Sequence, residues 1–119
     1  MGMHSKSKGK RGELEAASLL RSHGMDARRA QQFKGTADSA DLECPTLEAL
    51  GLHLEVKRQE KMHLWGWMDQ CLADVGEGQK PLILYRPNGK PWVAIMLAED
   101  FLGTLNRLGV RDDEPDPLG

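Results

Sequence analysis

The fold of this chain is decided by residues 52–58, which read LHLEVKR. Apolar and polar residues alternate along this stretch, as they do in a β-strand with one buried face. A period of two places Glu55 and Lys57 beside each other on the polar face. The stretch therefore predicts a strand that holds a carboxylate and an ammonium group on one rigid surface.

This pair of side chains suits a site for a metal ion and a water molecule. The carboxylate of Glu55 binds a hard cation, the main-chain carbonyl of Val56 is a further oxygen ligand, and Lys57 orients the attacking water. His53 lies on the same face, where it contacts substrate or metal, or is a partly buried structural histidine. The alternative for Glu55 and Lys57 is a solvated ion pair on an ordinary strand.

A second carboxylate, that of Asp41, precedes Glu55 by 14 residues. Residues 40–44 read as a short strand, and residues 45–51 have the length of a hairpin connection, which would bring Asp41 beside Glu55. Two carboxylates in one space repel each other unless a divalent cation lies between them. Asp38 is the alternative second carboxylate, and Asp41 is then a turn residue.

The elements on either side of residues 52–58 define the fold class. Helices are predicted at 12–23, 62–75 and 98–108, and strands at 28–33, 40–44, 81–85 and 92–97. This order, α-β-β-β-α-β-β-α, predicts an α/β fold with a mixed central sheet of about five strands flanked by helices. Helix 62–75 is then the crossover between parallel strands. We expect a disordered basic N-terminus at 1–8, one domain at 9–110 and an acidic flexible tail at 111–119.

Length and composition exclude several classes of protein. A chain of 119 residues, 39% hydrophobic and 29% charged, is one ordinary globular domain. The two cysteines, Cys44 and Cys71, lack zinc-ligand spacing and fit a reducing cytosol. No apolar run approaches the roughly 20 residues that span a bilayer. We therefore expect a cytoplasmic protein with no membrane partner.

The charge is unevenly distributed along the chain. Net charge is −2, yet residues 1–40 carry eight Lys and Arg against four Asp and Glu. A basic region of this kind suits contact with the phosphates of nucleic acid. The alternative, for residues 6–10, is a solubilising tail. The predicted phosphate contacts are Lys8, Lys10, Arg11, Arg28, Arg29, Lys34 and Arg58.

These residues resemble a known family. Ala40-Asp41 followed by Glu55-Val56-Lys57 resembles the signature of the PD-(D/E)XK nucleases. Gly9 and Glu13, at the start of an amphipathic helix, resemble the opening of archaeal-type Holliday junction resolvases. Residues 64–70, LWGWMDQ, are similar to a helix of short phage nucleases of this type. The resemblance covers residues 8–97. The chain departs from it where Ala40 replaces the proline and where Arg58 replaces a serine after the lysine.

The resemblance implies a restriction-endonuclease-like core and hydrolysis of DNA, most of all branched DNA. It implies that Asp41 and Glu55 bind one or two Mg²⁺ ions, with Mn²⁺ as a substitute, and that Glu13 adds a third carboxylate. Lys57 then acts in the chemical step and Gln70 is an accessory residue. A homodimer in a bacterial or phage-infected cell is also implied.

Three alternatives remain. The protein is another nuclease of the same class (nicking, restriction or repair), a non-catalytic nucleic-acid-binding protein with the same fold, or an unrelated α/β domain with a chance Glu-x-Lys. Among the remaining residues of helix 62–75, Trp65 and Trp67 are expected to pack against the protein or a second copy. Cys71 is expected to be an inert residue of the core.

Overall fold

The computed structural model describes residues 2–29 and 42–112, with side chains from residue 9 onward. Helices and strands follow one another in an α/β order. They are α1 (Gly2–Ser22), β1 (Arg28–Arg29), β2 (Leu42–Glu43), α2 (Pro45–Ala49), β3 (Leu52–Arg58), α3 (Leu64–Asp74), β4 (Lys80–Arg86), β5 (Val93–Ile95) and α4 (Ala98–Arg107).

The strands of the described residues form two sheets. In the larger sheet, β3 pairs in parallel with β4, and β4 pairs antiparallel with β5. The smaller sheet is an antiparallel pair of β1 and β2. The mixed sheet and the crossover through α3 are thus confirmed. The sequence predicts one sheet of about five strands, whereas pairing within the described part of the chain leaves β1 and β2 as a separate pair.

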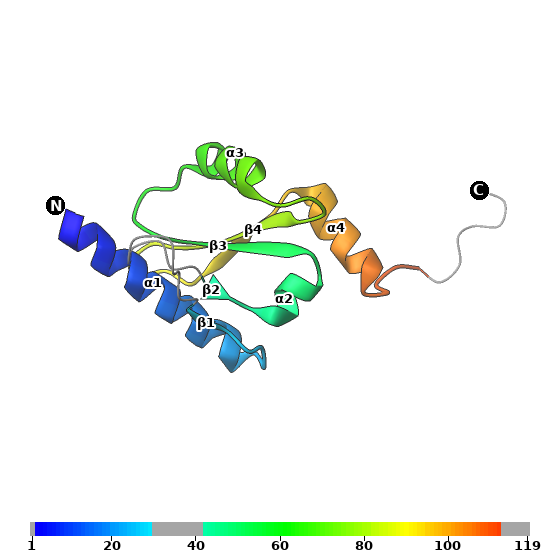
Figure 1. Cartoon of the computed structure of the whole chain (residues 1–119), viewed down its shortest axis with the longest axis horizontal. Coiled ribbons are helices and arrows are strands. Elements are labelled where there is room, and N and C mark those ends of the chain that lie inside the picture. The colour runs from blue at the N-terminus through cyan, green and yellow to red at the C-terminus, as the bar shows by residue number, and fades with distance from the viewer. Residues whose placement is uncertain (1, 30–41, 113–119) are drawn as a thin grey trace.

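Strand β4 separates two hydrophobic clusters because its side chains alternate between the faces of the sheet. Leu82 and Leu84 pack on the side of α1, and Ile83 and Tyr85 pack on the side of α3. Figure 1 shows α1 and α3 on opposite sides of the β3–β4 layer. The structure therefore has three layers, with α1 packed on one face of β3 and α3 on the other.

Helix α1 covers the apolar face of β3. Ala16, Ala17 and Leu20 are buried there, whereas Leu14 is 48% exposed. The helix begins at Gly2, although the sequence predicts disorder for residues 1–8 and a helix from residue 12. Once a helix has nucleated, each added residue gains a hydrogen bond, and no proline interrupts this segment.

The connection between β2 and β3 contains a short helix instead of a plain hairpin loop. Pro45 occupies the start of α2, where its fixed φ suits a helix and its missing N–H costs nothing. The Oε2 atom of Glu48 accepts a hydrogen bond of 2.9 Å from the backbone N–H of Cys44. This contact stabilises the helix start as the acidic half of a capping box does.

Helix α3 covers the polar face of β3. Trp67, Met68 and Cys71 are buried, which confirms the predictions for Trp67 and Cys71. Trp65 is 62% exposed, so it does not pack within the described part of the protein, and its contact with a second copy stays a prediction. No helix in the described ranges is long and apolar enough to cross a membrane.

Candidate functional site

The predicted catalytic strand has the expected form. Strand β3 covers residues 52–58, and Glu55 and Lys57 pair in register with Ile83 and Tyr85 of β4. Ile83 and Tyr85 pack with α3, so the same face of β3 presents Glu55 and Lys57 toward that helix. The sequence pattern thus predicted both the strand and the shared face.

Glu55 and Lys57 line a hollow between β3 and α3. The other residues around this hollow are Trp67, Gln70, Cys71 and Asp74, and its volume, part of which is open solvent, is about 210 Å³. Gln70 was predicted as an accessory residue and lies beside the predicted pair. Asp74 was not singled out from the sequence. Its helical spacing of four from Gln70 is the signal that places both on one face.

Trp67 holds the lysine in the hollow. The Nζ atom of Lys57 lies 5.7 Å from the centre of the Trp67 ring, within the range of a cation–π interaction. Trp67 itself is 7% exposed and packs on Tyr85, with ring centres 5.1 Å apart. The hydroxyl of Tyr85 donates a hydrogen bond of 2.8 Å to the carbonyl of Glu60. A packed and hydrogen-bonded aromatic pair therefore positions the ammonium group.

The charged side chains of the hollow shift the pKa of the Cys71 thiol. Burial raises the pKa of its thiol, and the carboxylate of Glu55 and, to a smaller extent, that of Asp74 raise it further, while Lys57 lowers it. The thiol is therefore neutral at physiological pH, which agrees with the prediction of an inert cysteine. Both carboxylates and the ammonium group of Lys57 thus act on the same buried thiol.

His53 lies at the other end of the polar face of β3. Its Nε2 atom is 3.8 Å from Oε1 of Glu55, and its side chain is 32% exposed. It also lines a second hollow with Leu42 of β2 and Leu54 of β3. Strand β2 therefore lies beside β3 near Glu55. The residue before Leu42 is Asp41, which, with Asp38, lies outside the described residues.

The donor atoms of the hollow suit a hard cation in kind. They are carboxylate oxygens of Glu55 and Asp74 and an amide oxygen of Gln70. Val56, whose carbonyl is the predicted main-chain ligand, lies between Glu55 and Lys57 on β3 but is not among the residues that line the hollow. Within residues 9–29 and 42–112, no group of three His, Cys, Asp or Glu side chains is arranged to hold a metal ion. The predicted set of ligands also requires Asp41.

Glu13 is positioned by the smaller sheet. Its Oε1 atom accepts a hydrogen bond of 2.9 Å from Nε of Arg29 in β1, and its side chain is 19% exposed. Arg29, predicted to contact phosphate, is 25% exposed in this ion pair. The described residues of the hollow come from β3 and α3 alone. The pair of Glu13 and Arg29 therefore ties α1 to β1.

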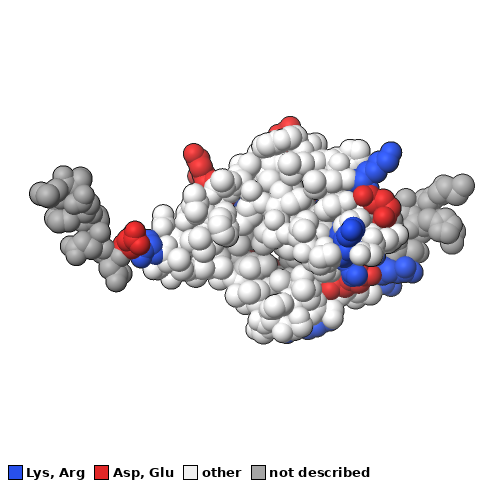
Figure 2. Space-filling view, turned by 180° about the vertical axis from the view of Figure 1, so that it is seen from behind, with Lys and Arg blue, Asp and Glu red and all other residues white. Residues whose placement is uncertain are grey.

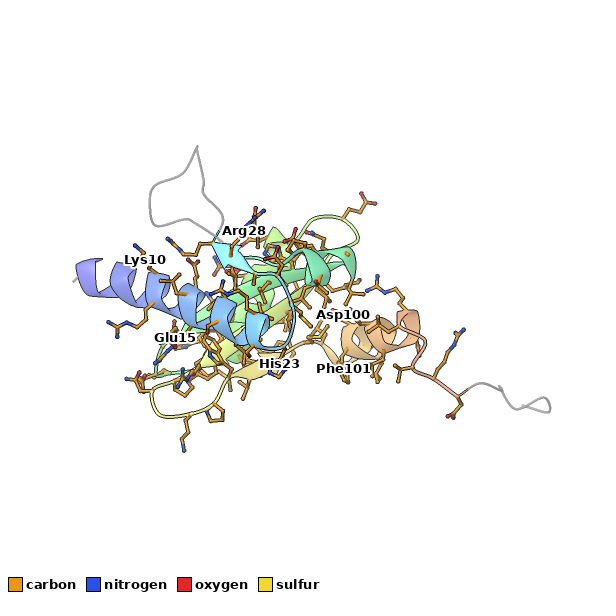
Figure 3. The ribbon with its side chains drawn as sticks, turned by 90° about the horizontal axis from the view of Figure 1, so that it is seen from below. Lys10, Glu15, His23, Arg28, Asp100 and Phe101 are labelled. Carbon is orange, nitrogen blue, oxygen red and sulfur yellow. The ribbon has the colours of Figure 1, made fainter. Side chains whose placement is uncertain are left out.

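Some of the side chains predicted to contact phosphate are exposed, and others form ion pairs within the protein. Lys10, Arg11 and Arg28 are exposed, and Arg28 has a 3.5 Å contact with Glu43. In Figure 3, Lys10 and Arg28 lie on the side of α1 away from Glu15. Seen from behind, charged side chains gather toward the end of the molecule that carries the N-terminus (Figure 2). The side chain of Lys8 and all of Lys34 lie outside the described residues.

Arg58 has a structural contact that the sequence did not reveal. Its Nε atom donates a 2.9 Å hydrogen bond to Glu15, its guanidinium also contacts the carbonyl of Arg86, and its side chain is only 10% exposed. Glu15 also pairs with Arg86 at 3.2 Å. Arg58 therefore joins α1, β3 and β4, and we remove it from the set of phosphate contacts.

Comparison with protein-family models, curated proteins and solved structures gives no match for this chain. The chemistry of the site therefore carries the functional conclusion.

Proposed function

We propose that this protein is a metal-dependent endonuclease that hydrolyses phosphodiester bonds in DNA. The observation that carries the proposal is the hollow in which Glu55, Lys57 and Gln70 meet between β3 and α3. A carboxylate and an ammonium group on one strand, with an amide from the facing helix, form a small polar site for a phosphate and a water. The proposed fold is the restriction-endonuclease-like core. The order of the described elements supports this fold, with the short helix α2 as an addition between β2 and β3.

Glu55 and the carbonyl of Val56 are the proposed metal ligands on β3. Asp41 and Glu13 are proposed as the further carboxylates, because one strand alone supplies too few oxygens for Mg²⁺ or Mn²⁺. When bound, the cation lowers the pKa of a coordinated water and neutralises charge at the phosphate. Leu42, the residue after Asp41, lies beside His53 and Leu54, which supports Asp41 as the partner of Glu55.

Lys57 acts on the reacting atoms in this proposal. Its ammonium group, 5.7 Å from the centre of the Trp67 ring, keeps its charge available to the hollow. There it orients the attacking water and stabilises the negative charge that develops on the phosphate oxygens. Gln70 donates or accepts a hydrogen bond at the same water or phosphate. His53 contacts the backbone of the substrate next to Glu55.

The substrate in this proposal is branched DNA, held through phosphates by the exposed Lys10, Arg11 and Arg28. Contacts of this type position the DNA without reading its bases. A homodimer would place two sites on two strands, which symmetric cleavage of a junction needs. Such an enzyme acts in the cytoplasm of a bacterial or phage-infected cell, where its DNA is found.

The test is cleavage of a panel of junction, flap, nicked and linear DNAs with and without Mg²⁺. We expect wild-type cleavage with metal only, and strongest on the junction. Lys57→Ala should lower the cleavage rate at least about 100-fold, the usual loss when a charge-stabilising donor is removed, with DNA affinity retained. Lys61→Ala is the matched control, because Lys61 is exposed and lies outside the lining of the hollow.

The cleavage pattern distinguishes the proposed junction-cutting enzyme from a non-catalytic binding protein and from other nucleases. If wild-type protein binds DNA but cuts none of the panel with Mg²⁺ or Mn²⁺, it is a binding protein and the nuclease proposal is wrong. If Lys57→Ala cuts as well as Lys61→Ala, the hollow is not the active site. Preference for linear duplex over junctions would point to a restriction or repair role.

A further inference from the structure

A second and larger hollow lies between β2, α2 and β3, next to the candidate active site (Figure 1). Its volume, part of which is open solvent, is about 480 Å³, against about 210 Å³ for the hollow around Glu55. Its floor is apolar, because Leu42 and Leu52 are buried and Leu54 is partly buried. The polar side chains of the rim are those of Glu48, His53 and Gln79. An apolar floor with a few polar groups around it is the usual composition of a ligand site.

Two of the rim side chains are held in place by the backbone. Oε2 of Glu48 accepts the 2.9 Å hydrogen bond from the N–H of Cys44, and Oε1 of Gln79 accepts one of 3.2 Å from the N–H of Gly76. A backbone N–H can only donate, so the amide atom that faces Gly76 is the oxygen, and the NH₂ group of Gln79 remains to donate. The rim therefore presents a carboxylate acceptor and an amide donor.

His53 connects this rim to the candidate active site. Its Nε2 atom lies 3.8 Å from Oε1 of Glu55, which lines the first hollow, while His53 itself lines the second. The two residues are neighbours on one face of β3 because they are two positions apart. A DNA strand with a phosphate at Glu55 and its backbone at His53 therefore passes the second hollow with the adjacent nucleotide.

The chemistry of the second hollow favours a neutral and flat ligand. The carboxylate of Glu48 repels a phosphate, and one carboxylate with one amide oxygen supplies too few ligands for Mg²⁺ or Ca²⁺. A nucleobase has apolar faces and carries hydrogen-bond donors and acceptors on its edge. Enzymes that take a base out of the stack hold it against apolar side chains and bind its Watson–Crick edge. The leucine floor and the donor and acceptor of the rim match these two requirements.

We infer that the second hollow binds an unpaired base of the DNA, from the nucleotide next to the phosphate at Glu55. The base lies on the floor of Leu42, Leu52 and Leu54, and its Watson–Crick edge faces Glu48 and Gln79. In a duplex that edge is occupied by the complementary base, so the hollow selects DNA with unpaired nucleotides near a branch. The inference deepens the proposed function and rests on its DNA substrate.

Binding of the full chain to single strands tests the hollow without cleavage. One strand carries bases, and a second strand of the same length carries only abasic nucleotides, so both present the same phosphates. Affinities are measured without divalent metal, so that neither strand is cut. We expect the strand with bases to bind at least about tenfold more tightly, from stacking of one base together with its hydrogen bonds.

Two conservative variants exchange the donor and the acceptor of the rim. Glu48→Gln keeps an oxygen for the N–H of Cys44, and Gln79→Glu keeps one for the N–H of Gly76, so both backbone contacts survive. Each should reduce the tenfold difference at least about threefold, because a polar group of the base loses its partner. Glu77→Gln is the matched control, since it makes the same charge change at an exposed residue outside the lining.

The two variants combined keep the net charge of the protein. They should change the order in which strands of adenine, cytosine and thymine bind, because each base arranges its donors and acceptors differently along the edge. The same order in wild type and double variant, with a base-dependent difference that neither single variant lowers, overturns the inference. Equal affinity of the wild type for the two strands, or no DNA binding at all, does so as well.

The outcomes separate this inference from the proposed nuclease. Base-dependent binding that the rim variants lower, without cleavage in Mg²⁺ or Mn²⁺, supports the base site and refutes only the nuclease. Cleavage in Mg²⁺ that depends on Lys57, with binding that ignores the bases, supports the nuclease and refutes only the base site.

Discussion

Glycine 12 is the position at which the docking of α1 on the catalytic strand is most directly tested. A Cβ added at Gly12 would lie 2.5 Å from Cβ and 3.1 Å from Cγ of Arg58. Cβ of Arg58 is fixed by the backbone of β3, so the helix or the strand has to move. Gly9, one turn earlier in α1, has no atom within 4 Å of such a Cβ. The two glycines therefore form a matched pair in one helix.

The expected free energies of unfolding follow from two opposing effects. Gly→Ala inside an exposed helix stabilises by about 1 kcal/mol, so Gly9→Ala should raise stability by up to that amount. Gly12→Ala gains the same helix propensity but also overpacks the contact with Arg58, which costs about 1–3 kcal/mol. The Gly12 variant should thus be less stable than the Gly9 variant by about 1–3 kcal/mol.

Urea unfolding of both variants measures this difference, and thermal unfolding should show it as a gap of roughly 4 °C or more in Tm. A change in the urea midpoint at constant slope identifies a stability effect. If Gly12→Ala stabilises the protein as much as Gly9→Ala does, α1 does not approach Arg58 closely. The described packing of α1 on β3 would then be wrong.

Two further outcomes follow from the charges of the site. Replacing the exposed Lys10 and Arg28 together by serine should weaken DNA binding. The slope of the logarithm of the binding constant against the logarithm of salt concentration should become less steep by about 0.9 for each phosphate that these side chains neutralise. An unchanged slope would show that DNA binds to another surface. Because burial and then Glu55 raise the pKa of Cys71, Glu55→Gln should lower that pKa and shift alkylation of this thiol to lower pH. Identical pH profiles for wild type and variant would show that the carboxylate does not act on Cys71.

Local pattern was sufficient to predict the central strand and the crossover helix. Strand period two placed Glu55 and Lys57 on one face, and helical spacing put Trp67 and Cys71 on the buried side of α3. Both signals depend only on neighbouring residues, so no knowledge of the rest of the fold was needed. The spacing from Gln70 to Asp74 carries the same kind of information.

The sequence pattern could not predict the contacts of Glu15 with Arg58 and Arg86, because these arginines lie 43 and 71 residues after Glu15 in the chain. The sequence equally supported Arg58 as a phosphate contact, since charge alone does not reveal a partner. Only the packing of α1 on β3 assigned that guanidinium to a carboxylate.

By itself, the sequence determined where apolar and polar residues alternate along a strand and that Glu55 and Lys57 share one face of β3. It also determined which residue types could bind a metal ion. These properties are local, and a pattern over a few residues contains them. Tertiary structure alone decided that Trp67 holds Lys57, that Leu14 and Trp65 are exposed, and that α4 turns its apolar side outward. Burial depends on what lies opposite a residue in space. An amphipathic pattern indicates that a helix face is suited to packing, but it does not indicate whether this chain or another molecule packs against that face.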